Sequence, residues 1–276
     1  ILRDEWGFDG CVITDWGGAH DTKEAALNGL DIEMGSYTNG LTSDNSLGYN
    51  LYYLADPYLE MLKKGELPMA SVDAKARNIL RLIFRTSLNQ NKPYGSLCTK
   101  EHYDVAKVIG DESIVLLRNN GILPLQADKY NRILVVGDNA VRRLTDGGGS
   151  SELKPKDMIS PLDALRALYG DKIEYTQGYA CGRPFFGHEE EMRQTVIDFL
   201  RAEAVAKARQ ADVVIYVGGL NKNAFQDCES TDRKSYNLPF SQNELIEELV
   251  AVNPNLVIAN ISGNAYAMPW LQKVPA

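Results

Sequence analysis

RILVVGD, at residues 132–138, is a near-continuous apolar run typical of a buried strand. After it, helical and strand-like segments alternate: the helix PLDALRALYG (161–170), the strand KIEYTQG (172–178), a helix at 190–210, the strand ADVVIYVGG (211–219), a helix at 241–253 and the strand NLVIANISG (255–263). Strands rich in Val and Ile that alternate with helices are typical of a parallel sheet covered on both faces. The sequence therefore predicts an α/β fold with a mostly parallel sheet between helices.

Residues 1–87 carry a shorter version of the same alternation. They comprise a strand at 10–14, a short helix ending at Asn28-Gly29, a strand at 30–34 (LDIEM), a helix at 50–65, and a helix at 71–87 with Ser71 as its N-cap. This order predicts the C-terminal part of a parallel β/α architecture. Residues 88–102 contain Asn, Gly, Pro and Ser without periodicity, which predicts a linker. A helix predicted for Tyr103–Arg118 then opens a second domain, 103–276.

Composition excludes several kinds of protein. The 276 residues carry a formal net charge of −8, which argues against a nucleic-acid partner. No apolar run approaches the ~18 residues that a membrane helix needs. Four cysteines without a CxxC pair and only three histidines give no metal signature. Because the chain opens without Met or a signal peptide and closes in mid-segment, we expect it to be part of a longer polypeptide.

Residues 11–18, CVITDWGG, place a carboxylate and an indole directly after an apolar strand. Asp15 and Trp16 precede a Gly-Gly turn, so Asp15 is expected at the carboxyl end of the strand. In parallel β/α folds that end is where ligands bind and catalytic residues lie. The alternative is that Asp15 caps the next helix while Trp16 packs against the core.

A second polar cluster lies at 218–240, a loop of some twenty residues after the strand DVVIYV. It contains Asp227, Glu229, Asp232 and Arg233, and loops of this length at strand ends are often functional. A solvated acidic loop with a local ion pair of Arg233 is the alternative. The glycine-rich DGGGSS (146–151) fits neither GxGxxG nor GxxxxGK[ST], so a surface loop or a loop bordering a site is expected rather than a nucleotide site.

Two carboxylates and an aromatic platform suit the hydrolysis of a glycosidic bond. GFDGCVITDWGGAHD (7–21) resembles the nucleophile motif of glycoside hydrolase family 3, GFxGxxxSDW, with Thr14 where Ser is usual. LDIEM resembles its GLDxEM segment, and DESIVLLRNNGILPL (111–125) its EGIVLLKNxGxLPL stretch. Residues 219–246 resemble the acid/base loop, GLNxxxxxEGxDRxxLxLPxxQxxLI, and NISGNAYAMPW (260–270) the strand that follows.

The resemblance implies a fold and a set of site residues. The fold is the C-terminal part of a (β/α)8 barrel, followed by an α/β sandwich domain with a mostly parallel sheet. Asp15 would be the nucleophile, Glu229 the general acid/base, and Trp16 part of the sugar-binding site. Asp232 and Arg233 match a DR pair expected to order the loop, whereas Ser230 stands where the family usually has Gly. If that Gly has a positive φ, Ser230 costs on the order of 1–2 kcal/mol.

The implied function is a retaining, exo-acting β-glucosidase that cleaves oligosaccharides or glucosides without a metal or cofactor. A β-xylosidase or another exo-β-glycosidase of the family, or a non-catalytic glycan-binding fragment, is the alternative. We expect the carboxyl groups of Asp15 and Glu229 to lie about 5–6 Å apart, as retention requires. Further expectations are no membrane or nucleic-acid partner, a homo-oligomer or a barrel completed by the full-length chain, and a periplasmic or extracellular location suggested by the family.

Overall fold

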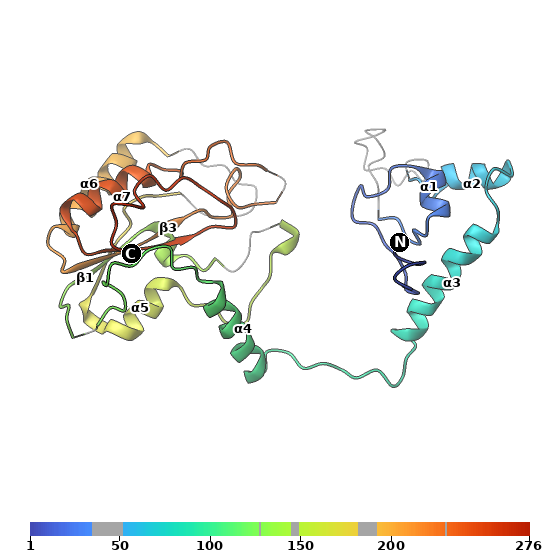
Figure 1. The fold of residues 1–276 in the computed structure, drawn as a ribbon, viewed down its shortest axis with the longest axis horizontal. Coiled ribbons are helices and arrows are strands. Elements are labelled where there is room, and N and C mark those ends of the chain that lie inside the picture. The colour runs from blue at the N-terminus through green and yellow to red at the C-terminus, as the bar shows by residue number, and fades with distance from the viewer. Residues whose placement is uncertain (35–51, 127, 145–148, 182–191, 230) are drawn as a thin grey trace. The chain divides into compact units, whose positions relative to one another are not determined.

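In a computed structural model of the chain, the described residues are 1–34, 52–126, 128–144, 149–181, 192–229 and 231–276. They form two compact units, Ile1–Ser96 and Leu97–Ala276, each described here by itself (Figure 1). The division falls inside the segment predicted as a linker. Among the described residues, no helix has both the length and the apolar character needed to cross a bilayer.

The second unit is built on a four-stranded sheet. Its strands are β1 (Ile133–Val136), β2 (Ile173–Thr176), β3 (Val213–Gly219) and β4 (Leu256–Ile261). They lie in the order β2-β1-β3-β4, and each neighbouring pair is parallel, with Val135 opposite both Tyr175 and Ile215. The predicted mostly parallel sheet is therefore confirmed.

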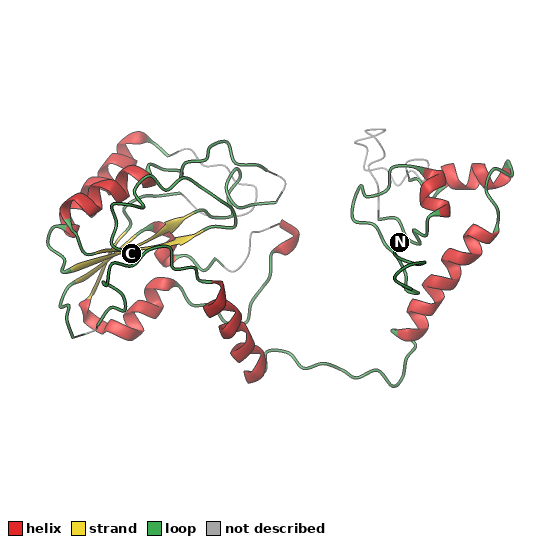
Figure 2. Cartoon of the chain, viewed as in Figure 1, coloured by secondary structure: helices red, strands yellow, loops and turns green. Residues whose placement is uncertain are grey.

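Helices cover both faces of this sheet, as predicted (Figure 2). The helices are α5 (Pro161–Tyr169), α6 (Gln194–Ala208) and α7 (Gln242–Val252), with short 3-10 turns η3 (Asp138–Val141), η4 (Gly149–Ser151) and η5 (Gly170–Lys172). Leu134 and Val136 of β1 pack with α6 and α7, while Ile133 and Val135 pack with α5. All four side chains are fully buried, and burial of each contributes about 1.5–3 kcal/mol.

Helix α4 (Lys100–Ser113) corrects the prediction for Tyr103–Arg118. It begins earlier because Thr99 forms a capping box: its Oγ1 accepts a hydrogen bond from the His102 N–H, and its own N–H donates to His102 Nδ1. It ends before Ile114 and Val115, whose β-branched side chains favour extended backbone.

The first unit contains α1 (Thr22–Leu27), α2 (Asp56–Lys63) and α3 (Ala70–Arg85). Of the predicted helix 50–65, residues 50 and 51 lie outside the described residues, and α2 itself begins at Asp56 because Pro57 suits a first turn. The prediction that Ser71 caps α3 is wrong, since Met69 occupies that position. The Ser71 hydroxyl instead donates to the Pro68 carbonyl and contacts the Tyr58 hydroxyl, both at 2.6 Å.

The strands predicted at 10–14 and 30–34 are also wrong as full strands. Within the described residues 1–34 they form one parallel bridge, Ile13 to Ile32. Ile13 is 53% exposed, whereas the apolar run predicted a buried strand. Two short segments that pair only with each other make a marginal sheet. Their parallel direction nevertheless fits a β/α unit.

Candidate active site

Asp15 lies in a tight turn at the end of the 10–14 segment. Its Oδ1 accepts a hydrogen bond of 2.7 Å from the Trp16 N–H, and its carbonyl accepts one from Gly18. The carboxylate is exposed, and the adjacent Trp16 is 64% exposed. The alternative roles therefore fail, because Asp21 caps α1 and the Trp16 indole does not pack into a core.

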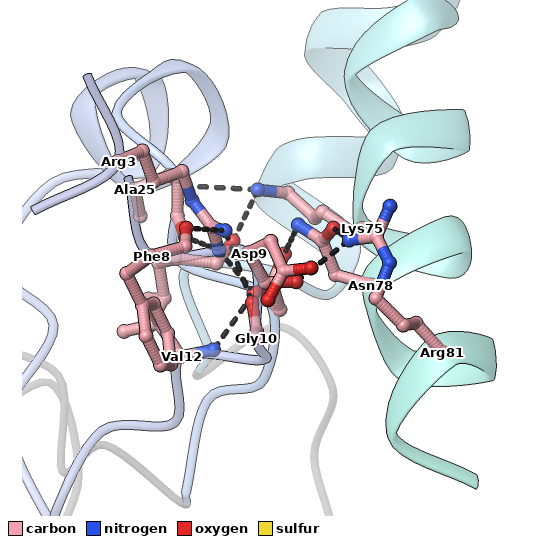
Figure 3. A network of polar contacts seen from close by, with 12 residues as sticks. Arg3, Phe8, Asp9, Gly10, Val12, Ala25, Lys75, Asn78 and Arg81 are labelled. Atoms are coloured by element: carbon pink, nitrogen blue, oxygen red, sulfur yellow. Dashed lines mark hydrogen bonds and ion pairs between the residues drawn. The ribbon is translucent and has the colours of Figure 1, made fainter. Parts of the chain in front are cut away.

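The segment that presents Asp15 is fixed by a buried carboxylate, Asp31. Figure 3 shows the polar network around Arg3, Val12 and Asn78 to which it belongs. Asp31 Oδ2 accepts hydrogen bonds from the Val12 N–H at 2.7 Å and from Arg3 Nη2 at 2.6 Å. Its Oδ1 accepts one at 2.9 Å from Asn78 on α3. Because the Asp31 side chain is only 1% exposed, these bonds are poorly screened by water.

Two further side chains extend this support. Lys75 of α3 donates to the carbonyl groups of Ala25 and Ala26, at 3.1 and 3.0 Å, and to that of Leu30. Burial lowers the pKa of the Lys75 ammonium, and the charge of Asp31 acts against this shift. Thr14 Oγ1 accepts a 2.8 Å bond from the Met34 N–H, so Thr supplies a hydroxyl where the family motif has Ser.

We expect Asp31→Ala to loosen this segment selectively. Removing one partner of a buried charge pair leaves Arg3 without its counter-charge and the Val12 N–H without its acceptor, which costs about 3 kcal/mol. Hydrogen exchange read by mass spectrometry should show about 100-fold less protection in peptides covering 9–34. Peptides covering β1 are the internal control, and Asp4→Ala removes an exposed carboxylate of the same unit. Equal exchange rates in Asp31→Ala and Asp4→Ala would show that Asp31 does not stabilise this segment.

In the second unit, the loop that carries Glu229 leaves the carboxyl end of β3. Gln242, fully buried at the start of α7, fixes the point of departure. Its Oε1 accepts hydrogen bonds from the Gly219 N–H and the Tyr216 hydroxyl, and its Nε2 donates to the Gly219 carbonyl. The end of β3 is therefore held on both its donor and its acceptor groups.

The first half of this loop is buried and braced by side-chain amides. Asn139 Nδ2 donates to the Leu220 carbonyl at 3.0 Å, and Asn223 Nδ2 to the Cys181 carbonyl at 3.1 Å. Glu229 itself is exposed, and Thr231 closes the turn around it, because its Oγ1 accepts from the Phe225 N–H at 2.9 Å. A rigid base thus carries an exposed carboxylate.

Glu229 borders a pocket of about 700 Å³, and none of the described residues that line it has a large aliphatic or aromatic side chain. The lining residues are Ser151, Gln226, Asp227, Cys228, Glu229, Thr231, Asp232, Arg233, Gly263 and Asn264. Ser151, the last residue of the glycine-rich segment, lies in η4 and lines this pocket, whereas residues 146–148 lie outside the described part of the chain. Ser230 also lies outside the described residues.

Arg233 connects two loops of the pocket. Its Nη2 donates to the Ala265 carbonyl in the segment after β4, and its guanidinium lies over the Tyr236 ring, 5.8 Å from the centroid. Asp232 is exposed beside it. Asp15 and Trp16 belong to the first unit and Glu229, Asp232 and Arg233 to the second, so the convergence of the two groups remains a prediction.

Sequence reasoning missed the hydrogen-bond partners of two carboxylates of the second unit. Asp138, 1% exposed after β1, accepts hydrogen bonds from Arg142 at 2.7 and 2.9 Å, from Gln177 at 2.9 Å and from Cys181 at 3.0 Å. Asp227 was placed in a polar loop, but its partners Gly263 and Asn264 follow a different strand. The sequence feature that could have indicated these partners is the polar turn SGN, directly after β4.

Comparisons with known proteins agree on one family. A family model described as the glycosyl hydrolase family 3 C-terminal domain matches residues 114–276. A β-glucosidase from Bacteroides ovatus is 57% identical over 282 aligned residues, which span 100% of this chain and 38% of that protein. An exo-α-(1→6)-L-arabinopyranosidase from Bifidobacterium breve is 32% identical, over 98% of this chain and 33% of that protein.

A solved structure gives the same result. The crystal structure of a family 3 β-glucosidase from Bifidobacterium adolescentis aligns with a TM-score of 0.73 and 30% identity, covering 100% of this chain and 36% of that one. The chain thus spans about a third of the length of each of these three proteins. On the match of the family model and of relatives along its whole length, the chain belongs to glycoside hydrolase family 3.

Proposed function

We propose that this chain is the part of a retaining, exo-acting β-glucosidase that supplies both catalytic carboxylates. The observation that carries the proposal is the exposed Glu229, which a braced loop holds at the border of a pocket of about 700 Å³. The 57% identity to a β-glucosidase supports the same activity. In this proposal residues 1–87 end a (β/α)8 barrel, 88–102 are a linker, and 103–276 form the sandwich domain.

The proposed reaction is a double displacement. Asp15 attacks the anomeric carbon while Glu229 protonates the leaving oxygen, which yields a glycosyl-enzyme and a free alcohol or sugar. Glu229, now a carboxylate, then removes a proton from a water that attacks the anomeric carbon and releases glucose. Trp16 offers a flat apolar face to the sugar ring, and Asp232 and Arg233 order the loop that carries Glu229.

The test uses a hybrid enzyme, in which residues 1–276 replace the matching 38% of the Bacteroides ovatus β-glucosidase. The hybrid enzyme should hydrolyse p-nitrophenyl β-glucoside, and a 2-deoxy-2-fluoro-glucoside should label Asp15, as located by peptide mass spectrometry. The 276-residue chain alone should hydrolyse little, because a (β/α)8 barrel needs eight strands and residues 1–34 pair only two segments.

Two results would contradict this account. Label on a residue other than Asp15 would move the nucleophile. Turnover by the chain alone within tenfold of the hybrid enzyme would show that the remaining barrel is dispensable, or that a second copy supplies it. The Asp15→Asn hybrid enzyme, which should take no label, is the control for nonspecific alkylation.

A second specificity has its own support. The relative from Bifidobacterium breve, named an exo-α-(1→6)-L-arabinopyranosidase, is 32% identical over almost the same stretch. Rates of the hybrid enzyme on p-nitrophenyl α-L-arabinopyranoside, β-xyloside and β-glucoside separate these specificities. Binding of glucose or cellobiose without any turnover would instead favour a glycan-binding protein.

A further inference from the structure

Two loops that leave neighbouring parallel strands meet beside Glu229. The acid/base loop, residues 220–240, follows β3, and the second loop, residues 262–270, follows β4. The strands end in register, with Gly219 opposite Ile261, and the Leu220 N–H donates to the Ile261 carbonyl at 2.8 Å. Both loops therefore start from the same fixed edge of the sheet.

Asp227 joins the two loops. Its Oδ2 accepts a 2.5 Å hydrogen bond from the Gly263 N–H, and its Oδ1 accepts a 2.7 Å bond from Asn264 Nδ2. Its own N–H donates to the Asn221 carbonyl at 2.8 Å, within the buried half of the acid/base loop. The residue is thus bound to the second loop by its side chain and to the first by its backbone.

The contact between the two loops is close. A Cβ atom added at Gly263 would lie 3.3 Å from Asp227 Cγ, so the glycine lets the backbone approach the carboxylate. The carboxylate is half-buried, and burial raises its pKa, while the Gly263 N–H and the charge of Arg233 act against this shift. A half-buried carboxylate with two donors is costly to displace.

Glu229 follows Asp227 by two residues, and the intervening Cys228 is itself held, with its Sγ 2.7 Å from Thr231 Oγ1. The backbone between Asp227 and the exposed Glu229 carboxylate therefore has little freedom to move. We propose that Asp227 is a positioning residue, which clamps the acid/base loop to the second loop and so places Glu229 against the oxygen of the leaving group. This inference rests on the proposed function.

Proton transfer is sensitive to such placement. A general acid must lie about 2.6–3.2 Å from the atom that it protonates. A misplacement of about 1 Å can cost on the order of 100-fold in rate. Loss of the clamp should therefore slow substrates that need protonation and spare those that do not.

The first variant is Asp227→Asn in the hybrid enzyme. Asn keeps the shape but carries no charge. After a flip of the Asn264 amide it makes at most two neutral hydrogen bonds, in place of two that the carboxylate charge strengthens. The kcat/KM for cellobiose, whose leaving group needs a proton, should fall roughly 10- to 100-fold. The kcat/KM for 2,4-dinitrophenyl β-glucoside reports formation of the glycosyl-enzyme, and it should change less than about threefold, which also shows that the variant folds.

A rescue variant tests whether the hydrogen bonds carry the effect. When Asp227→Asn is combined with Asn264→Asp, the amide introduced at position 227 can accept from the Gly263 N–H and donate to the carboxylate introduced at position 264. The cellobiose rate should recover to within about threefold of the parent. Asn264→Asp alone places two carboxylates together and should be at least as slow as Asp227→Asn.

A final pair of variants tests whether Asp227 acts through Glu229. In a Glu229→Gln background, Asp227→Asn should have no further effect on cellobiose. A further loss in that background, an equal loss on both substrates, or no recovery in the rescue variant would overturn the inference. Azide rescue of Asp227→Asn with none of Glu229→Gln would also overturn it, by making Asp227 itself the acid/base. If Glu229→Gln alone changes nothing, the proposed function fails instead.

Discussion

Asp15→Asn in the hybrid enzyme should lower kcat/KM for every β-glucoside by on the order of 10⁴-fold or more. The amide cannot attack the anomeric carbon, so the loss should not depend on the leaving group. Steady-state rates should be measured on cellobiose, which has a poor leaving group, and on 2,4-dinitrophenyl β-glucoside, which has a good one. The exposed turn and the indole beside it are unchanged by the substitution, so binding of glucose should persist.

The matched control for Asp15→Asn is Asp21→Asn. Asp21 is an exposed carboxylate six residues further on, and it caps α1 by accepting a hydrogen bond from the Glu24 N–H at 2.8 Å. Because Asn caps helices about as well as Asp, this variant should keep full activity. Substantial turnover by Asp15→Asn, or a comparable loss in Asp21→Asn, would remove Asp15 from the role of nucleophile.

Glu229→Gln should produce a different signature, because the acid is needed only where the leaving group is poor. Rates on cellobiose should fall about 10²- to 10⁴-fold, whereas the first step on 2,4-dinitrophenyl β-glucoside should be spared. The glycosyl-enzyme should then accumulate, since no base activates water. Added azide, which needs no base, should restore turnover and yield β-glucosyl azide.

Pre-steady-state bursts and product analysis by NMR measure this signature. Glu244→Gln, an exposed carboxylate in the first turn of α7, is the control and should behave like the parent. If Glu229→Gln loses activity equally on both substrates and azide has no effect, the acid/base role moves to Asp227 or Asp232.

The sheet of the second unit could be predicted because its strands are buried on both faces. Ile133–Val136 and Val213–Val217 lie against helices on each side, and such strands consist almost entirely of Val, Ile and Leu. The 10–14 segment has a similar composition, but only one neighbouring segment among the described residues pairs with it. Composition reports the tendency of a segment to form a strand, whereas the neighbours decide whether a sheet forms.

Side-chain roles were less predictable where the partner is distant in sequence. Ser71 is a residue type that often caps helices, yet its hydroxyl group forms a hydrogen bond with the Tyr58 hydroxyl instead. Asp227 and its partner Asn264 are 37 residues apart, and they meet only because β3 and β4 are neighbours in the sheet. Asp15 and Glu229 were assigned from motifs, which encode chemistry directly, and their catalytic roles stay predictions.

The bond pattern of Gln242 has a consequence for how enzymes of this fold diversify. Its side-chain amide takes the place of a peptide group on the next strand, and so it completes the hydrogen-bond ladder at Gly219. Both backbone polar groups of Gly219, the residue before the acid/base loop, therefore have hydrogen-bond partners. Substitutions, insertions and deletions between Gly219 and α7 can therefore change the placement of Glu229 without unravelling the strand that supports the loop.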